Sequence, residues 1–277
     1  MVSFCIKSLN KKIIDELELH FNNLKMQDIF YSQKKFSKFY NFIFHYTGNN
    51  LDDFYTILSK IMAEFIIDNY EKNFILSILK YDFFYFSDDE KSSILKNLYD
   101  LLNSKEMLSE RLLILENCIY EFHKTTRKYN IDGFINFRIG DYKEFLNTAL
   151  EQAIHKYVLD KEYSEYVDLL KEYIHTQKSQ TSKMHLIYTS DDALLLDEFG
   201  NIVTTTASKK YLSDISFSKN DFILNSILSF IPGTLIVHSF NQEDSFIHFL
   251  KLIFDNKLII CDNCDLCKSF SAISIKK

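Results

Sequence analysis

Residues 134–177 constrain the fold of this 277-residue chain more than any other segment. Apolar residues recur along its first part at the spacing of one helix face, and along its second part with a different phase. Where the first face would continue, near residue 160, the side chains are charged or carry a hydroxyl. One straight helix cannot turn both faces toward a single surface, so the pattern predicts a helical pair over 141–177 with a kink or corner near 159–162.

The chain has one proline, Pro232, and five glycines, which favours long uninterrupted helices over a turn-rich all-β fold. Hydrophobic residues make up 47% of it and charged residues 25%, enough apolar material for a real core. The order of patterns predicts an α+β fold in three regions. Residues 1–130 are mainly helical with a short strand at Val2–Lys7, residues 131–180 hold the helical pair, and residues 181–277 form an α/β region that ends in a cysteine cluster.

The C-terminal region has the pattern of a mixed sheet. Phe199-Gly200-Asn201 separates two strand-like runs and predicts a β-hairpin. Further along, an apolar strand over 233–239, an amphipathic helix over 243–255 and a second apolar strand over 257–260 predict a βαβ unit with parallel strands. We expect the N-terminal strand to join this sheet.

Three cysteines in the run CDNCDLC are the cluster best suited to chemistry. Two residues between successive thiols let a tight turn point Cys261, Cys264 and Cys267 at one centre. Cys261 ends one strand of the βαβ unit and His238 nearly ends the other, so three thiolates and one imidazole can meet if the strands are neighbours. The residues predict a Cys₃His zinc site; an iron–sulfur cluster, a thiol–disulfide switch and plain reduced cysteines remain as alternatives.

Carboxylates around the hairpin form a second, weaker candidate. Asp191, Asp192, Asp197 and Glu198 lie close together in the sequence and could bind a divalent cation, since hard cations prefer oxygen ligands. Acidic residues at strand ends are more often simply solvated. The chain lacks the Gly-rich phosphate loop, the GxSxG pattern and the HExxH pattern of well-known enzyme classes.

The net charge of −6 gives the chain no global basic field, so we expect no nucleic-acid partner. One local basic cluster, Lys124, Arg127 and Lys128, is interpreted as the end of a helix, where cations complement the helix dipole. No membrane span is expected, because Pro232-Gly233 divides the uncharged run 222–242 into two short pieces.

An odd number of cysteines, five, and an N-terminus without a charged-then-apolar leader predict a location in the reducing cytoplasm.

Three segments in order carry a family resemblance: residues 134–177, the hairpin LLLDEFGNIV, and TLIVHS followed by KLIICDNCDLC. Over roughly residues 130–267 this arrangement resembles the YtxC-like family, sporulation proteins of endospore-forming Firmicutes. The resemblance implies a cytoplasmic protein connected with spore formation. It brings no defined activity, substrate or cofactor, and no functional residues to carry over.

These observations together favour a non-enzymatic protein that acts through a protein partner whose identity the sequence does not give, with a structural zinc at the cysteine cluster. One alternative is a metal- or redox-dependent enzyme that uses the same cysteines. Another is a nuclease-like metal enzyme that uses the carboxylates around Asp197.

Overall fold

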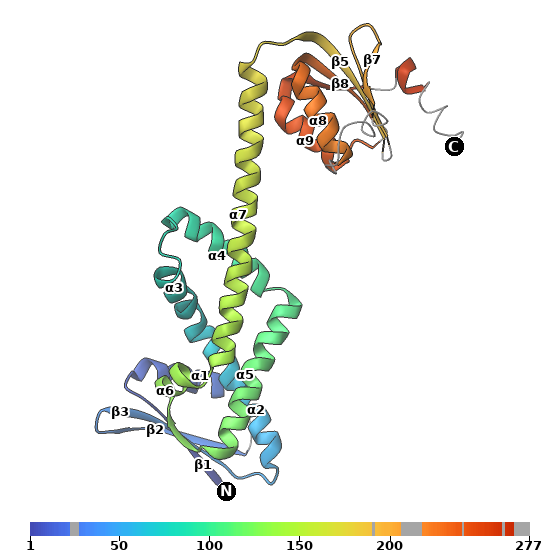
Figure 1. The fold of residues 1–277 in the computed structure, drawn as a ribbon. Coiled ribbons are helices and arrows are strands. Elements are labelled where there is room, and N and C mark those ends of the chain that lie inside the picture. The colour runs from blue at the N-terminus through green and yellow to red at the C-terminus, as the bar shows by residue number, and fades with distance from the viewer. Residues whose placement is uncertain (23–27, 190–191, 206–217, 240, 262–263, 269–277) are drawn as a thin grey trace. The chain divides into compact units, whose positions relative to one another are not determined.

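The chain folds into two compact units, Met1–Leu159 and Asp160–Lys277, each with its own apolar core (Figure 1). Both units pack helices on a mixed β-sheet, which confirms the predicted α+β class. The computed structural model describes residues 1–22, 28–189, 192–205, 218–239, 241–261 and 264–268.

Unit 1 contains a four-stranded sheet in the order β2-β3-β1-β4. The prediction that the N-terminal strand joins the C-terminal sheet is wrong, because β1 lies inside this sheet, antiparallel to β3 and parallel to β4. β2 was not anticipated from the sequence; its alternation of exposed and half-buried residues lacks a strong apolar run. The strands are β1 (Val2–Ser8), β2 (Ile29–Phe36), β3 (Phe39–Tyr46) and β4 (Lys128–Asn130).

Helices fill the rest of unit 1, as the sequence predicts, and several begin at side-chain caps. The side chain of Asn50 accepts hydrogen bonds from the backbone N–H groups of Asp52 and Asp53, and Ser87 forms a reciprocal capping box with Glu90. The helical elements are α1 (Lys11–Asn22), α2 (Leu51–Ile66), the π-helical η1 (Ile67–Glu71), α3 (Lys72–Tyr81), α4 (Asp88–Leu102), α5 (Lys105–Thr125) and α6 (Ile131–Phe137).

A buried ion pair lies inside unit 1. The Arg111 guanidinium on α5 donates to both carboxylate oxygens of Glu71, at 2.9 and 3.1 Å, and the Tyr142 hydroxyl donates to the same carboxylate. Glu71 ends the π-helical segment η1, where the backbone departs from regular α-geometry. All three side chains are buried, so the charges are compensated by one another and not by water.

The predicted kink near 159–162 is absent: α7 is one continuous helix, Gly140–Thr176. Its two apolar faces have different surfaces to cover. Tyr142, Leu146 and Leu150 enter the core of unit 1, while Leu170 and Ile174 enter the core of unit 2. Since each half packs in a different unit, the phase change needs no corner, and the expected helical pair is a single helix.

Unit 2 contains a five-stranded sheet in the order β7-β6-β5-β8-β9. The predicted hairpin is confirmed, with β5, β6 and β7 antiparallel, and the predicted βαβ unit is confirmed as β8-α9-β9 with parallel strands. β5 also pairs parallel with β8. The elements are β5 (Thr181–Tyr188), β6 (Ala193–Leu196), β7 (Ile202–Thr205), α8 (Lys219–Phe230), β8 (Pro232–Ser239), α9 (Ser245–Phe254), the 3₁₀ turn η3 (Asp255–Lys257) and β9 (Leu258–Ile260).

The two faces of this sheet have different environments. Leu186, Leu235 and Val237 belong to the unit 2 core, to which α8, α9 and the C-terminal half of α7 also contribute. Because successive side chains of a strand alternate between faces, His185 on β5 and His238 on β8 point to the opposite face. That second face carries the candidate site.

None of the helices in the described segments is long and apolar enough to cross a membrane. The described residues 222–239 of the uncharged run instead divide between α8 and β8, on either side of Ile231.

Candidate metal centre

The structure brings together the four side chains that the sequence nominates. His238 lies one residue from the end of β8, and Cys261 directly follows β9, where its backbone N–H donates to the Val237 carbonyl at 2.9 Å. Cys264 and Cys267 lie on a helical turn closed by a backbone bond from Lys268 N–H to the Cys264 carbonyl. The parallel pairing of β8 and β9 therefore carries residues 23 positions apart to one place.

The ligand atoms of His238, Cys261, Cys264 and Cys267 all lie within 4.8 Å of one another. The Sγ atom of Cys267 is 3.7 Å from that of Cys261 and 3.9 Å from that of Cys264. The Nδ1 atom of His238 is 3.3 Å from the Cys267 sulfur and 3.5 Å from the Cys264 sulfur.

The four individual separations, from 3.3 to 3.9 Å, have the size of the edges of a zinc tetrahedron. Zinc bonds of ~2.3 Å to sulfur and ~2.0 Å to nitrogen, at tetrahedral angles, place two sulfurs ~3.8 Å apart and a nitrogen and a sulfur ~3.5 Å apart. A cluster of several irons fills more space between its ligands than one ion does, so the compact set suits a single ion better. All three thiols are free in this structure.

The pKa values of two of these thiols are shifted in opposite directions, one by hydrogen bonding and the other by burial. The backbone N–H of Cys267 donates to the Cys264 sulfur and lowers the pKa of that thiol. Burial, followed by the neighbouring thiols, raises the pKa of Cys267 to about 11. A bound cation reverses the second effect, because a coordinating thiol loses its proton.

His185 contacts His238 and was not among the residues that the sequence nominated. Its Nδ1 atom is 2.9 Å from Nε2 of His238, and the two rings stack with centroids 5.2 Å apart. With His238 Nδ1 facing the thiols, a proton on Nε2 would form a hydrogen bond to His185 Nδ1, and this would fix the tautomer that a metal ligand needs. Burial lowers the pKa of both imidazoles and so favours their neutral forms. Only the parallel pairing of β5 with β8 brings His185 next to His238. Local sequence patterns do not specify this pairing, so the sequence alone did not reveal the contact.

On a bound zinc ion, these four side chains would leave no coordination position open. Four protein ligands fill the tetrahedral shell of zinc, whereas catalytic zinc sites keep one position for water or substrate. His238 and Cys267 are buried, and Cys261 and Cys264 are half-buried. The arrangement suits an ion that holds β8, β9 and the C-terminal turn together.

The carboxylate candidate does not assemble in the described residues, where the His238 and cysteine set is the one group of metal-binding side chains found. Asp197 instead shapes the hairpin turn: it accepts hydrogen bonds from the backbone N–H groups of Phe199 and Asn201. Hydrogen bonding from the Asn201 side chain, above all, lowers the pKa of Asp197. Glu198 accepts a hydrogen bond from Ser182, and Asp191 lies outside the described residues.

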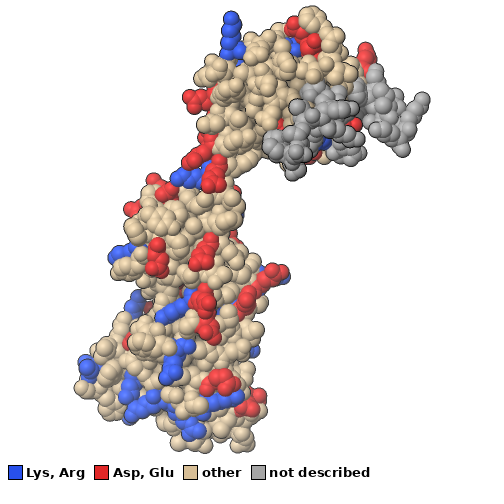
Figure 2. All heavy atoms as spheres, in the orientation of Figure 1, with Lys and Arg blue, Asp and Glu red and all other residues tan. Residues whose placement is uncertain are grey.

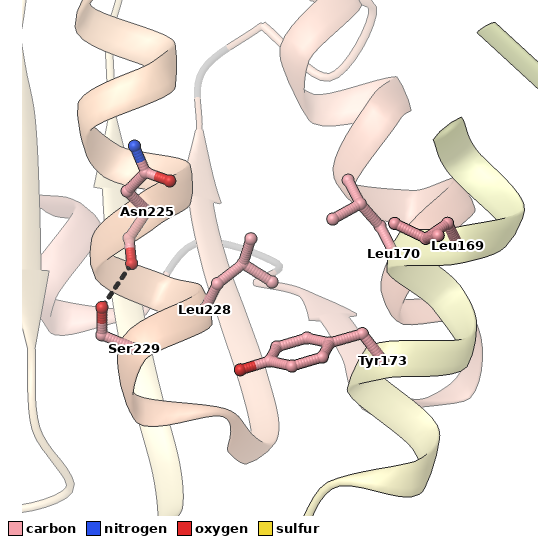
Figure 3. A pocket seen from close by; sticks show the side chains of 6 residues that line it. All are labelled: Leu169, Leu170, Tyr173, Asn225, Leu228 and Ser229. Atoms are coloured by element: carbon pink, nitrogen blue, oxygen red, sulfur yellow. Dashed lines mark hydrogen bonds between the residues drawn. The ribbon is translucent and has the colours of Figure 1, made fainter. Parts of the chain in front are cut away.

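A second concave feature of unit 2 lies between α7 and α8 and was not anticipated from the sequence (Figure 3). Its volume is about 660 Å³. The lining contains aliphatic, phenol, amide and hydroxyl side chains, and the Ser229 hydroxyl already donates to the Asn225 carbonyl one turn earlier. This groove offers contact area, but its lining contains no carboxylate, imidazole, amine or thiol side chain. Its lining residues are Leu169, Leu170, Tyr173, Asn225, Leu228 and Ser229.

Comparison with known proteins places the chain in a family. The YtxC-like family matches residues 56–259. This match begins earlier than the resemblance over roughly residues 130–267 that the sequence analysis describes, and it ends just before Cys261. The chain is 19% identical to Uncharacterized protein YtxC of Bacillus subtilis strain 168 over 217 residues, which cover 73% of this chain and 75% of that protein. No solved structure matches. Since the family match covers well over half of its length, the chain belongs to the YtxC-like family.

Proposed function

We propose that this protein is a cytoplasmic, sporulation-associated protein that acts through protein partners and not as an enzyme. A zinc ion bound by Cys261, Cys264, Cys267 and His238 stabilises its second unit. The observation that carries the proposal is the closed ligand set, whose atoms lie within 4.8 Å of one another. A site with four protein ligands supports a structural role for the ion.

The cytoplasmic location fits the chemistry of the site. Zinc binds thiolates, and an oxidising compartment would convert neighbouring thiols to disulfides. All five cysteines are free. The setting in sporulation rests on the resemblance to sporulation proteins of endospore-forming Firmicutes, and membership of the YtxC-like family supports it.

Metal analysis tests the zinc. The full chain is purified without metal-affinity steps, and its metals are measured beside a Cys264→Ser variant and a Cys118→Ser control in unit 1. We expect about one zinc per chain, lost in Cys264→Ser and retained in Cys118→Ser. Zinc absent from the wild-type protein, or retained in Cys264→Ser, would overturn the structural-zinc proposal.

The alternative, a redox- or metal-dependent enzyme, has one observation in its favour: the pKa of Cys264 is lowered and its thiol is half-buried. An absorption spectrum of the same preparation separates the two. A visible band from thiolate-to-iron charge transfer, or reversible formation of a disulfide within the cluster without bound zinc, would favour the enzyme.

Spore counts test the biological setting. In the bacterium that encodes this protein, the gene is disrupted and then complemented with wild type, Cys264→Ser or Cys118→Ser. We expect fewer heat-resistant spores after disruption, with recovery by wild type and Cys118→Ser but not by Cys264→Ser. Normal spore numbers after disruption would contradict the sporulation role and leave the zinc proposal standing.

A further inference from the structure

The outer face of the unit 1 sheet is open, basic and aromatic. Phe4 and Ile6 on β1 and Phe42 and Phe44 on β3 point into the apolar core. The alternate residues therefore point the other way and define this outer face. Six of them carry the charge and the rings that matter here: Lys7, Lys34, Lys128, Phe30, Phe36 and Phe39.

Strand pairing brings these residues together from distant parts of the chain. Asn41 on β3 lies between Lys34 on one side and Lys7 on the other. Lys128 on β4 lies beside Cys5 on β1. Residues up to 121 positions apart thus form one continuous surface, which explains why no local sequence pattern reveals it.

The charged side chains of the strands that form this surface are all positive. Strands β1 to β4 contain four lysines and no aspartate or glutamate. Lys38 in the β2–β3 turn and Arg127 just before β4 add to the charge, and none of these cations is in an ion pair among the described residues. Figure 2 shows Lys and Arg gathered over the end of unit 1 that holds β1, β2 and β3.

Edge protection explains only part of this charge. Lysines on the edge strand β2 discourage pairing with another chain, which accounts for Lys34 and Lys35. Lys7 lies on β1, an interior strand, and has no such role. Its ammonium stands 5.9 Å from the ring centre of Phe39, and that of Lys38 stands 5.6 Å from the same ring. Cation–π contact keeps both charges over the face.

The aromatic rings of this face are exposed to solvent. Phe30 is 61% exposed and Phe36 is 59% exposed, although phenylalanine is usually buried. They are six positions apart on an extended strand, a span of ~20 Å. Phe36 pairs directly with Phe39 across the hairpin. The face therefore offers stacking platforms at both ends with lysines between them.

We propose that this outer face binds single-stranded nucleic acid, with its lysines on the phosphates and Phe30 and Phe36 stacked on unpaired bases. A positive groove or face with interleaved aromatic rings is how proteins bind single strands without sequence preference. The net charge of −6 describes the whole chain, whereas a ligand at this face meets the local charge. The proposal is independent of the zinc site in unit 2.

The first test removes charge. A fluorescein-labelled oligodeoxythymidine of about 12 nucleotides is titrated with the full chain at several salt concentrations and followed by anisotropy. The face variant carries Lys7→Gln, Lys34→Gln and Lys38→Gln. The matched control carries Lys60→Gln, Lys96→Gln and Lys105→Gln, exposed lysines on helices of the same unit.

The slope of log affinity against log salt is negative. Loss of three phosphate contacts should make it shallower by about 2 in the face variant. The control should keep the wild-type slope and affinity, although its net charge equals that of the face variant.

The second test removes stacking. Phe30→Ala with Phe36→Ala should weaken binding at least tenfold, a loss of about 1.4 kcal/mol, without changing the salt slope. The matched control is Phe84→Ala with Phe137→Ala, two exposed rings elsewhere in unit 1, 72% and 84% exposed. Because the lysine set and the phenylalanine set are independent, loss of folding in one still leaves the other to decide.

Several results would overturn the proposal: no binding by the wild-type chain at low salt, equal weakening in the lysine control and the face variant, or duplex DNA binding as tightly as the single strand. Binding to phosphatidylserine-containing vesicles without binding to the oligonucleotide would assign the face to a membrane surface instead.

Discussion

The two units share a plan, helices on a mixed sheet, but differ in what their interiors hold. Unit 1 buries an aromatic cluster, in which Phe4 stacks on Phe44 at 5.2 Å, and an ion pair whose charges satisfy each other. Unit 2 places three thiols and an imidazole around a common centre, on the sheet face opposite its apolar core. Unit 1 therefore compensates its buried ion pair with its own side chains, whereas unit 2 gathers four side chains that have the chemistry of metal ligands.

This difference indicates that the two units are stabilised by different interactions. Burial of apolar area and a compensated ion pair operate without any added component. A thiolate and imidazole set contributes fully only with the metal bound, and then metal affinity becomes folding free energy. We expect unit 1 to fold in the absence of metal and unit 2 to depend on it.

Loss of a ligand should have the largest effect. In Cys264→Ser, unit 2 should lose most of a zinc contribution that reaches ~10 kcal/mol in small zinc domains, and its unfolding transition should move far down or disappear. Differential scanning calorimetry of the full chain measures this, and we expect the two units to give separate transitions. The unit 1 transition should stay in place, and Cys5→Ser should leave the unit 2 transition unchanged. A single transition that shifts as a whole would refute the separation.

Breaking the buried ion pair should have the next largest effect, on the other unit. Glu71→Gln leaves the Arg111 guanidinium buried without its counter-charge and should cost unit 1 about 3–5 kcal/mol. Replacing both partners with apolar residues, Glu71→Leu with Arg111→Met, should recover much of that loss. Chemical denaturation measures both variants. Asp15→Asn, which breaks an exposed pair with Lys11, should have no measurable effect.

Removing the support of the metal ligand should have a smaller effect. His185→Ala takes away the acceptor for His238 Nε2–H and should weaken zinc binding 10- to 100-fold without changing the number of zinc ions bound. Competition with a chromophoric chelator measures this, with His155→Ala on α7 as the control. His185→Gln, which keeps an acceptor, should recover part of the affinity. Unchanged affinity in His185→Ala would show that the 2.9 Å contact does not position the ligand.

Mild acid should have the smallest effect, and in unit 1. Burial lowers the pKa of His123 to about 3, so this imidazole stays unprotonated in mild acid while unit 1 is folded. In the unfolded chain its pKa is near 6.5, so it takes up a proton over the same range. The unfolded state therefore binds more protons in this range, and stability falls as the pH falls. Between about pH 6 and pH 5 the loss is roughly 1 kcal/mol.

Urea denaturation of wild type and His123→Gln across this range checks the sign. The variant should lose this part of the pH dependence, and a slope equal to that of wild type would contradict the assignment to His123.

Local patterns predicted much of the fold because the responsible interactions are local. The turn at Gly200 and the β8-α9-β9 unit both follow from residues close in sequence. The cysteine cluster was found for the same reason, since the spacing of its thiols is short.

The errors and omissions all concern long-range packing. The corner in α7 was inferred on the assumption of one buried surface, and the structure supplies two. The partners of β1 and the contact of His185 with His238 depend on strand order, which no local pattern specifies. The basic outer face is another case, because Lys7 and Lys128 meet only through the sheet.

Hydrogen–deuterium exchange on the full chain, before and after zinc is removed with a chelator, tests the central claim most directly. The account predicts faster exchange in β5, β8 and β9 after chelation, while the amides of β1 and β3 keep their protection. Unchanged exchange in β8 and β9, or equal loss of protection in both units, would contradict a second unit held together by zinc.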